Sequence, residues 1–144
     1  MSEHKYDPLK LENQICFPLY AASRKVTSKY RNVLSELDLT YTQYITMMVL
    51  WEEREINVKE LGKRLYLDSG TLTPVLKSLE QKGYVVRTRS SLDERVLNVT
   101  LTETGKALRD RALAVPHEMA RCVALSIDES IELQRLLNKL LGCL

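Results

Sequence analysis

One stretch of the chain, residues 58–99, limits its possible folds more than any other. The apolar residues of Val58–Leu65 lie on one side, which predicts a short amphipathic helix. After a turn over residues 66–70, a second helix is expected to run to Lys82 and to stop at Gly83. Its apolar residues recur every three or four positions and form one buried stripe: Leu72, Val75, Leu76 and Leu79.

Two short segments rich in β-branched residues follow the second helix. Val85–Arg89 and residues 96–100 are separated by a polar stretch, residues 90–95, which predicts a β-hairpin. Two helices joined by a tight turn and followed by such a hairpin have the order of a winged helix-turn-helix. The expected fold class is therefore mainly α with a small β-wing.

The outer side of the second helix suits DNA, because its polar residues can donate hydrogen bonds and none is acidic. Four residues are expected to face the major groove: Ser69, Thr71, Thr73 and Lys77. Arg87 and Arg89 are two residues apart on one strand and would share a face that contacts phosphates. Arg95, at the hairpin tip, is expected at the minor groove. By composition alone, an ordinary α+β surface with a solvated hairpin fits as well.

The distribution of charge supports a nucleic-acid partner more than the net charge of +2 does. Residues 58–100 hold eight Lys or Arg against five Asp or Glu, whereas the rest of the chain holds thirteen against fourteen. The small positive excess thus lies where the motif lies.

The motif resembles the MarR family of bacterial repressors. Residues 61–77, including the run Asp-Ser-Gly-Thr-Leu-Thr-Pro at residues 68–74, and Asp-Glu-Arg at residues 93–95 carry the resemblance, which extends from about Leu11 to the last helix. The chain is most similar to the branch that senses organic hydroperoxides (OhrR-like). The resemblance implies a non-enzymatic homodimer that binds a pseudo-palindromic operator in double-stranded DNA, with Asp93 holding Arg95.

The two ends of the chain predict a dimerisation layer. An amphipathic helix follows Leu11, but Pro18 should make it begin near Cys16 or kink there. A helix over residues 102–122 is expected to bend at Pro116, and the last helix has too many apolar residues for one face. We expect one domain over residues 1–144. Its dimerisation helices occupy residues 11–38 and 102–144, and its winged helix-turn-helix occupies residues 42–100.

Capping boxes mark further helix starts. The predicted pairs are Thr40 with Gln43, Asn57 with Glu60, and Ser126 with Glu129. The first of them opens a helix over residues 42–53. The acidic run over residues 52–55 is expected to be a solvated turn.

Cys16 is the residue at which chemistry is expected. A buried cysteine is usually a small hydrophobic residue, but Tyr20 lies one helical turn on, and a helix N-terminus favours a thiolate. Glu12 opposes the thiolate, and no Lys or Arg lies three or four residues away. The resemblance implies that tyrosines matching Tyr20, Tyr30 and Tyr41 bond the sensing cysteine, the last two from the partner subunit.

The three cysteines do not predict a structural disulfide framework, since their number is odd and their spacing is unpaired. Some relatives in the resembling branch carry a second cysteine at about the place of Cys122, which forms a disulfide with the partner's sensor. Others have the sensor alone, which a small thiol caps. We interpret Cys122 as the resolving thiol, with packing as the alternative, and assign Cys143 no role.

The predicted function is a cytoplasmic repressor that releases its operator when an organic hydroperoxide oxidises Cys16. The chief alternative is a MarR-type repressor controlled by a noncovalent aromatic ligand, with Cys16 structural. A thiol peroxidase is disfavoured because no His base or Arg clamp is apparent. A metal sensor is disfavoured because His4, His117 and the cysteines have no ligand spacing. No cofactor, metal site or membrane contact is expected, and no signal peptide or 18-residue apolar run is present.

Overall fold

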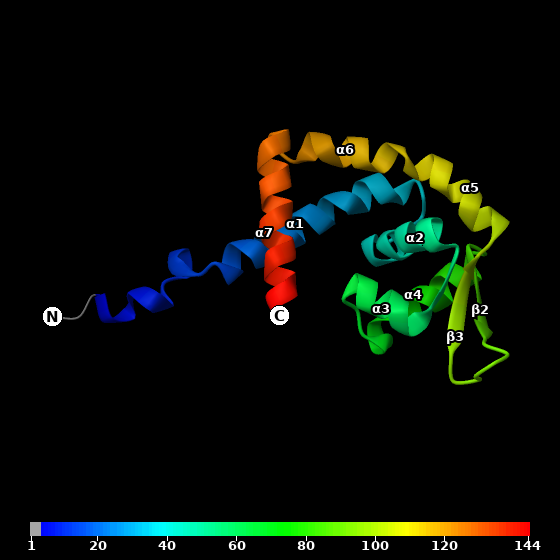
Figure 1. Ribbon diagram of the computed structural model, residues 1–144. Coiled ribbons are helices and arrows are strands. Elements are labelled where there is room, and N and C mark those ends of the chain that lie inside the picture. The colour runs from blue at the N-terminus through cyan, green and yellow to red at the C-terminus, as the bar shows by residue number, and fades with distance from the viewer. Residues whose placement is uncertain (1–3) are drawn as a thin grey trace.

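The computed structural model describes residues 4–144 and is mainly helical, with one small sheet (Figure 1). Its helices are η1 (His4–Leu9), η2 (Leu11–Asn13), α1 (Cys16–Ser35), α2 (Tyr41–Glu53), α3 (Val58–Leu65), α4 (Ser69–Gln81), α5 (Glu103–Ala112), α6 (Ala114–Cys122) and α7 (Ile127–Cys143). Its strands are β1 (Glu55–Asn57), β2 (Val85–Arg89) and β3 (Leu97–Leu101). The predicted fold class is confirmed, and α1 begins at Cys16 as expected. Of the predicted single domain, residues 1–3 lie outside the described part of the chain.

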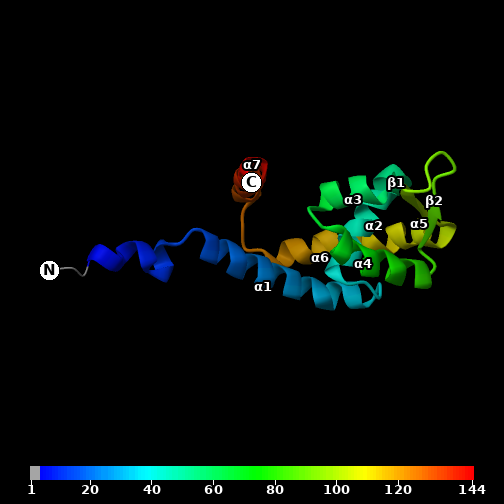
Figure 2. The same ribbon diagram turned by 90° about the horizontal axis from the view of Figure 1, so that it is seen from below.

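The molecule has two parts. Figure 1 shows α2, α3, α4 and the sheet gathered at one end, with α1 and α6 extending from it side by side. Figure 2 shows α7 standing clear of this body. Within residues 4–144, no helix combines the length and the apolar character that crossing a membrane requires.

The hydrophobic core lies in the compact part. Its largest fully buried side chains are Leu34, Met47, Leu50, Leu61, Leu72, Leu76, Leu79, Val85 and Val99. The stripe predicted on the second helix is thereby confirmed, with Val75 partly buried against the core. Within the described chain, α1 buries Leu34 alone and α7 buries no residue. The core is therefore built mainly by α2, α3, α4 and the sheet, α5 and α6 add Leu108, Ala112, Val115 and Met119 to it, and α7 lies outside it.

The turn between α3 and α4 is shorter than predicted, because Ser69 and Gly70 already belong to α4. The carboxylate of Asp68 caps this helix by accepting a hydrogen bond from the backbone N–H of Thr71 at 2.8 Å. A side-chain cap satisfies an amide that the first turn leaves unpaired, so α4 can begin directly after it. Tyr66 ends α3 in the left-handed conformation, with φ at 54°.

Two of the three predicted capping boxes are complete. The boxes at Thr40 and Ser126 have both reciprocal bonds. At the third, the Asn57 side chain accepts from the N–H of Glu60 at 2.9 Å, but the Glu60 carboxylate pairs with Lys63 instead. The expected end of α4 is also confirmed, since Gly83 follows it with φ at 78°.

The sheet has one strand that the sequence analysis missed. Its order is β1-β3-β2, and both pairings are antiparallel. The acidic run expected to be a solvated turn ends in β1, whose Ile56 pairs with Val99. Three residues are too few to display a strand pattern, so pairing with β3 alone makes this segment a strand. β3 itself begins at Leu97, one residue later than predicted.

The long helix expected over residues 102–122 is two helices, broken at Leu113 rather than at Pro116. The proline ring clashes with the carbonyl group four residues earlier, which is that of Ala112, and the proline has no N–H to donate. The interruption therefore falls before the proline, and Pro116 sits in the first turn of α6, where a missing N–H is tolerated.

Candidate nucleic-acid interface and cysteine site

The helix-turn-helix is held together by close backbone approach. A Cβ atom at Gly62 of α3 would lie 2.8 Å from the carbonyl oxygen of Leu67, so only glycine lets the turn pass this closely. Hydrogen bonds from the amide and the hydroxyl of Thr71 hold the pKa of the Asp68 carboxyl below its usual value. The carboxylate form that caps α4 is thus the favoured one at neutral pH.

The outer side of α4 is open to a ligand. Ser69, Thr71, Thr73 and Lys77 are all exposed, and Leu72 and Leu76 lie buried behind them. The Thr73 hydroxyl donates to the carbonyl of Ser69 at 2.7 Å, which leaves its oxygen as an acceptor. Ser69, Thr73 and Lys77 are four residues apart and share one accessible helix face, and Thr71 is exposed farther round the helix.

The wing lies beside this face. A groove with a volume of ≈ 650 Å³ runs between α3, the start of α4 and β3, and its polar lining includes Lys59, Lys63, Ser69 and Arg95. Lys59 and Lys63 were missed, although two lysines four residues apart at an exposed helix surface were a visible signal. The structure thus brings the wing and the first turn of α4 onto one concave surface, whose charged residues are three basic ones and Glu60, which pairs with Lys63.

The wing arginines have different surroundings. The Asp93 carboxylate accepts a bond from the backbone N–H of Arg95 at 3.0 Å and shapes the tip, and the Arg95 side chain is exposed. Arg89 donates to the carbonyl of Glu94 at 2.8 Å and braces the hairpin. Arg87 turns toward α4, where Nη2 and Nε lie 2.8 and 3.1 Å from the same oxygen of the Glu80 carboxylate.

The pair of Arg87 and Glu80 joins β2 to α4. The Arg87 backbone N–H also donates to Glu80, at 2.9 Å, so three bonds meet on one carboxylate. Hydrogen bonds from the Arg87 side chain and backbone hold the pKa of Glu80 below its usual value. The guanidinium of Arg87 is thereby engaged inside the protein, unlike that of Arg95.

Cys16 is the first residue of α1 and is exposed, as are Cys122 and Cys143, and all three are free thiols. Tyr20 follows one turn after Cys16 and is 58% exposed. Arg24 donates to the Tyr20 hydroxyl oxygen at 3.1 Å and places its guanidinium 5.4 Å from the ring centre. The Tyr20 O–H proton remains available for an acceptor.

Tyr30 and Tyr41 form an aromatic cluster at the other end of α1. Their ring centres are 4.8 Å apart, and Tyr44 lies 5.9 Å from Tyr30. Burial, reinforced by Tyr41 and Tyr44, raises the pKa of Tyr30 above its ordinary value. The Tyr30 hydroxyl is therefore protonated at neutral pH and can donate. Tyr44 was not predicted from the sequence, although it lies three residues after Tyr41 on the same helix face.

One chain does not bring the predicted redox residues together. At 1.5 Å per residue, Tyr30 lies about 21 Å from Cys16 along α1. Asn32, about 24 Å from Cys16 by the same measure, lines one hollow with Glu118 of α6. Cys122 is one turn, about 6 Å, beyond Glu118. Within one subunit Cys16 and Cys122 are both free thiols and form no disulfide.

The fold and the basic face define the class: a winged helix-turn-helix, DNA-binding transcriptional regulator. A family model described as "Transcriptional regulator SarA/Rot" matches residues 28–112. The chain is 50% identical over 114 residues to the organic hydroperoxide resistance transcriptional regulator of Bacillus subtilis (strain 168), which covers 79% of this chain and 78% of that protein. The chain belongs to the MarR/SarA family of winged helix-turn-helix regulators, whose members are not enzymes.

Two solved structures are informative. The structure of reduced AbfR bound to DNA matches with a TM-score of 0.83 at 34% identity, covering 96% of this chain and 95% of that one. Disulfide-formed AbfR matches with a TM-score of 0.65 at 36% identity, covering 98% and 99%. AbfR is a protein of Staphylococcus epidermidis. The structure of this chain is thus more similar to the reduced, DNA-bound form than to the disulfide form.

Proposed function

We propose that this protein is a cytoplasmic homodimeric repressor that releases its operator when an organic hydroperoxide oxidises Cys16. The observation that carries the proposal is the division of the cysteine site along α1. An exposed thiol with one tyrosine lies at the start of the helix, and the cluster of Tyr30 and Tyr41 lies about 21 Å away. Two antiparallel copies of α1 would bring the thiol of one subunit to the tyrosines of the other.

The terminal helices support a dimer. Large apolar side chains are exposed on both α1 and α7: Phe17, Leu19, Val26, Ile131, Leu133, Leu136, Leu140 and Leu141. Exposed apolar surface of this extent marks an association site, and a two-fold axis could cover both helices at once. The dimer would present two α4 helices to successive major grooves of a pseudo-palindromic operator.

The chemistry needs only the thiol and the oxidant. The Cys16 thiolate attacks the outer peroxide oxygen of the hydroperoxide, the O–O bond breaks, and the products are a sulfenate and an alcohol. Cys16 is oxidised and the hydroperoxide is reduced. The Cys122 thiol of the partner subunit then condenses with the sulfenic acid, which forms a disulfide and releases water. The names of the relatives, organic hydroperoxide resistance and disulfide-formed AbfR, support this sequence of steps.

The disulfide would act on DNA binding through geometry. It must bring the start of α1 and the end of the partner's α6 to within about 7 Å between Cα atoms. These helices carry the winged units, so the movement would turn the two α4 helices out of register with successive grooves. The lower TM-score to the disulfide form than to the DNA-bound form is in keeping with such a rearrangement.

The test is mass spectrometry of the intact protein after one equivalent of cumene hydroperoxide without reductant, combined with DNA-binding anisotropy. We expect a reducible covalent dimer and DNA release in the wild type, and neither in Cys16→Ser. Cys122→Ser should form a sulfenate but no covalent dimer. DNA release by oxidised Cys16→Ser would contradict the proposal. A response of Cys16→Ser to a noncovalent aromatic compound would favour the ligand-controlled alternative.

A further inference from the structure

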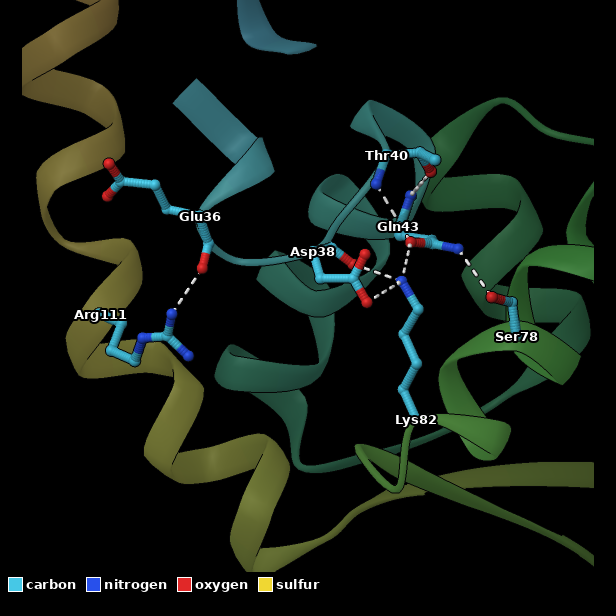
Figure 3. Close-up of polar contacts among 7 residues, drawn as sticks. All are labelled: Glu36, Asp38, Thr40, Gln43, Ser78, Lys82 and Arg111. Carbon is cyan, nitrogen blue, oxygen red and sulfur yellow. Dashed lines mark hydrogen bonds and ion pairs between the residues drawn. The ribbon is translucent and has the colours of Figure 1, made fainter. Parts of the chain in front are cut away.

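A group of polar side chains ties the end of the recognition helix α4 to the corner between α1 and α2 (Figure 3). We call it the polar junction, and it consists of Asp38, Gln43, Ser78 and Lys82. Asp38 lies in the corner and Gln43 in the first turn of α2, whereas Ser78 and Lys82 are one turn apart at the end of α4. The junction therefore joins segments that are 35 or more residues apart in sequence.

Gln43 is the centre of the junction. Its side chain is held on both ends: Oε1 accepts from the N–H of Thr40 at 3.1 Å, and Nε2 donates to the Ser78 hydroxyl at 3.0 Å. The residue is only 6% exposed. Of these two bonds, only the one to Thr40 belongs to the capping box of α2. The bond to Ser78 is additional and joins the start of α2 to α4.

Lys82 makes the second connection. Its ammonium group lies 3.2 Å from a carboxylate oxygen of Asp38 and 3.4 Å from Oε1 of Gln43, and it also donates to the Asp38 carbonyl. Asp38 has a positive φ of 52°, a conformation that L-residues rarely adopt. The Lys82 side chain, which is 25% exposed, thus contacts three acceptor atoms. Two belong to Asp38 in the left-handed corner and one belongs to Gln43.

The same end of α1 is tied to the helix on its other side. Arg111 of α5 donates to the carbonyl of Glu36 at 2.5 Å (Figure 3). The polypeptide after Ser35 is therefore bonded to both α4 and α5. A displacement of α1 would therefore have to break these hydrogen bonds or move α4 and α5 together with the corner.

We propose that the polar junction transmits the position of α1 to α4, so that Gln43 and Lys82 are positioning residues for DNA recognition. The inference rests on the proposed function, because it names the route by which oxidation at the start of α1 reaches the DNA-contacting helix. Neither residue needs to touch DNA or the oxidant. Both set the orientation of α4 relative to the corner.

The test compares two variants that remove the polar groups but keep the length of the side chains, Gln43→Met and Lys82→Met. The matched control is Lys106→Met, which removes an exposed lysine paired only within α5, with Glu103. The probe is a DNA duplex selected from a random library by the reduced wild-type protein. Its Kd is measured by anisotropy for reduced protein and for protein oxidised with cumene hydroperoxide, and thermal unfolding monitors the fold.

In both junction variants we expect the ratio of oxidised to reduced Kd to fall about 2- to 30-fold below that of the wild type. Lys106→Met should keep the wild-type ratio, and the rate of Cys16 oxidation in the absence of DNA should be the same in all four proteins. Lys82 is partly exposed, so Lys82→Met keeps the test available if Gln43→Met fails to fold.

Two results would overturn the inference in distinguishable ways. If the wild-type protein responds to the oxidant and both variants keep its Kd ratio, the junction is merely structural. In that case the Kd of the reduced protein and the Kd of the oxidised protein would rise by the same factor. If the wild-type affinity does not respond to oxidation, the proposed function fails first and the inference fails with it.

Discussion

The DNA-binding face and the cysteine site of this protein differ in how much of each a single chain contains. The face formed by α3, α4 and the wing is complete: its helices are capped, its apolar stripe is buried, and its polar residues point outward. The cysteine site is divided, since Cys16 and the cluster of Tyr30 and Tyr41 lie at opposite ends of α1. A single subunit thus holds the whole DNA-binding face, whereas the proposed sensing site would be complete only in a dimer.

The largest expected effect comes from breaking the assembly at α7. Leu136→Glu combined with Leu140→Glu places two charges on its exposed apolar face, and we expect a monomer in sedimentation. Affinity for the operator should fall about 10²- to 10⁴-fold, because two linked half-site contacts become one. The unfolding temperature of the winged unit should change little, since α7 contributes no buried residue within the described chain.

The matched control for this experiment is Lys139→Glu, which changes charge on α7 without replacing an apolar residue. It should remain dimeric and bind DNA. A double-Glu variant that stays dimeric would remove α7 from the proposed interface.

The second effect tests whether the tyrosine cluster completes the cysteine site. Tyr30→Phe should slow alkylation of Cys16 by roughly tenfold, since a hydrogen bond to a charged group is worth about 1.5 kcal/mol. DNA binding by the reduced protein should be unchanged, because phenylalanine keeps the ring that packs against Tyr41 and Tyr44. In the monomeric double-Glu variant, Tyr30→Phe should have no effect on the thiol. An unchanged alkylation rate in the dimer would assign Tyr30 to packing alone.

The parts of the fold that were predicted correctly from the sequence are those set by residues close together in the chain. The capping boxes at Thr40 and Ser126 and the stop at Gly83 are decided within one helical turn, so a local pattern reveals them. β1 was missed because its pairing partner lies more than forty residues away. The helix break was misplaced at Pro116 because a proline acts on the carbonyl four residues before it.

The contacts within the candidate sites show the same limit. The accessible face of α4 followed from periodicity, but the bond of Gln43 to Ser78 joins residues 35 positions apart, and no local pattern indicates it. The engagement of Arg87 by Glu80 depends on how β2 packs on α4. The division of the cysteine site becomes visible only when the length of α1 is known.

The third effect separates two arginines that were both predicted from the sequence to contact DNA. Arg95→Ala should weaken DNA binding roughly fivefold at about 0.15 M salt and reduce the slope of log K against log salt by about 0.9, as loss of one phosphate contact does. Arg87→Ala should instead lower the stability of the fold, with the salt slope nearly unchanged, because its guanidinium is held by Glu80. Equal salt slopes in Arg95→Ala and the wild type would remove the wing tip from the interface.

The smallest effect tests whether the DNA-binding face is stabilised within one subunit. Hydrogen bonds from Thr71 lower the pKa of the Asp68 carboxyl in the folded state. The carboxylate therefore stabilises the fold fully at a pH above the pKa of the unfolded chain, and this stabilisation is lost as the pH falls through the pKa of the folded state. Asp68→Asn keeps a capping side chain without a titrating group. Between neutral pH and about pH 3, below the usual value of about 3.9, the free energy of unfolding should fall more in the wild type than in Asp68→Asn. Urea denaturation at each pH measures the free energy of unfolding of both proteins.

The difference in pH dependence between the wild type and Asp68→Asn should persist in the monomeric double-Glu variant, because the cap and its bonds lie within one chain. Equal pH dependence in the wild type and Asp68→Asn would mean that the carboxylate is not the group that caps α4.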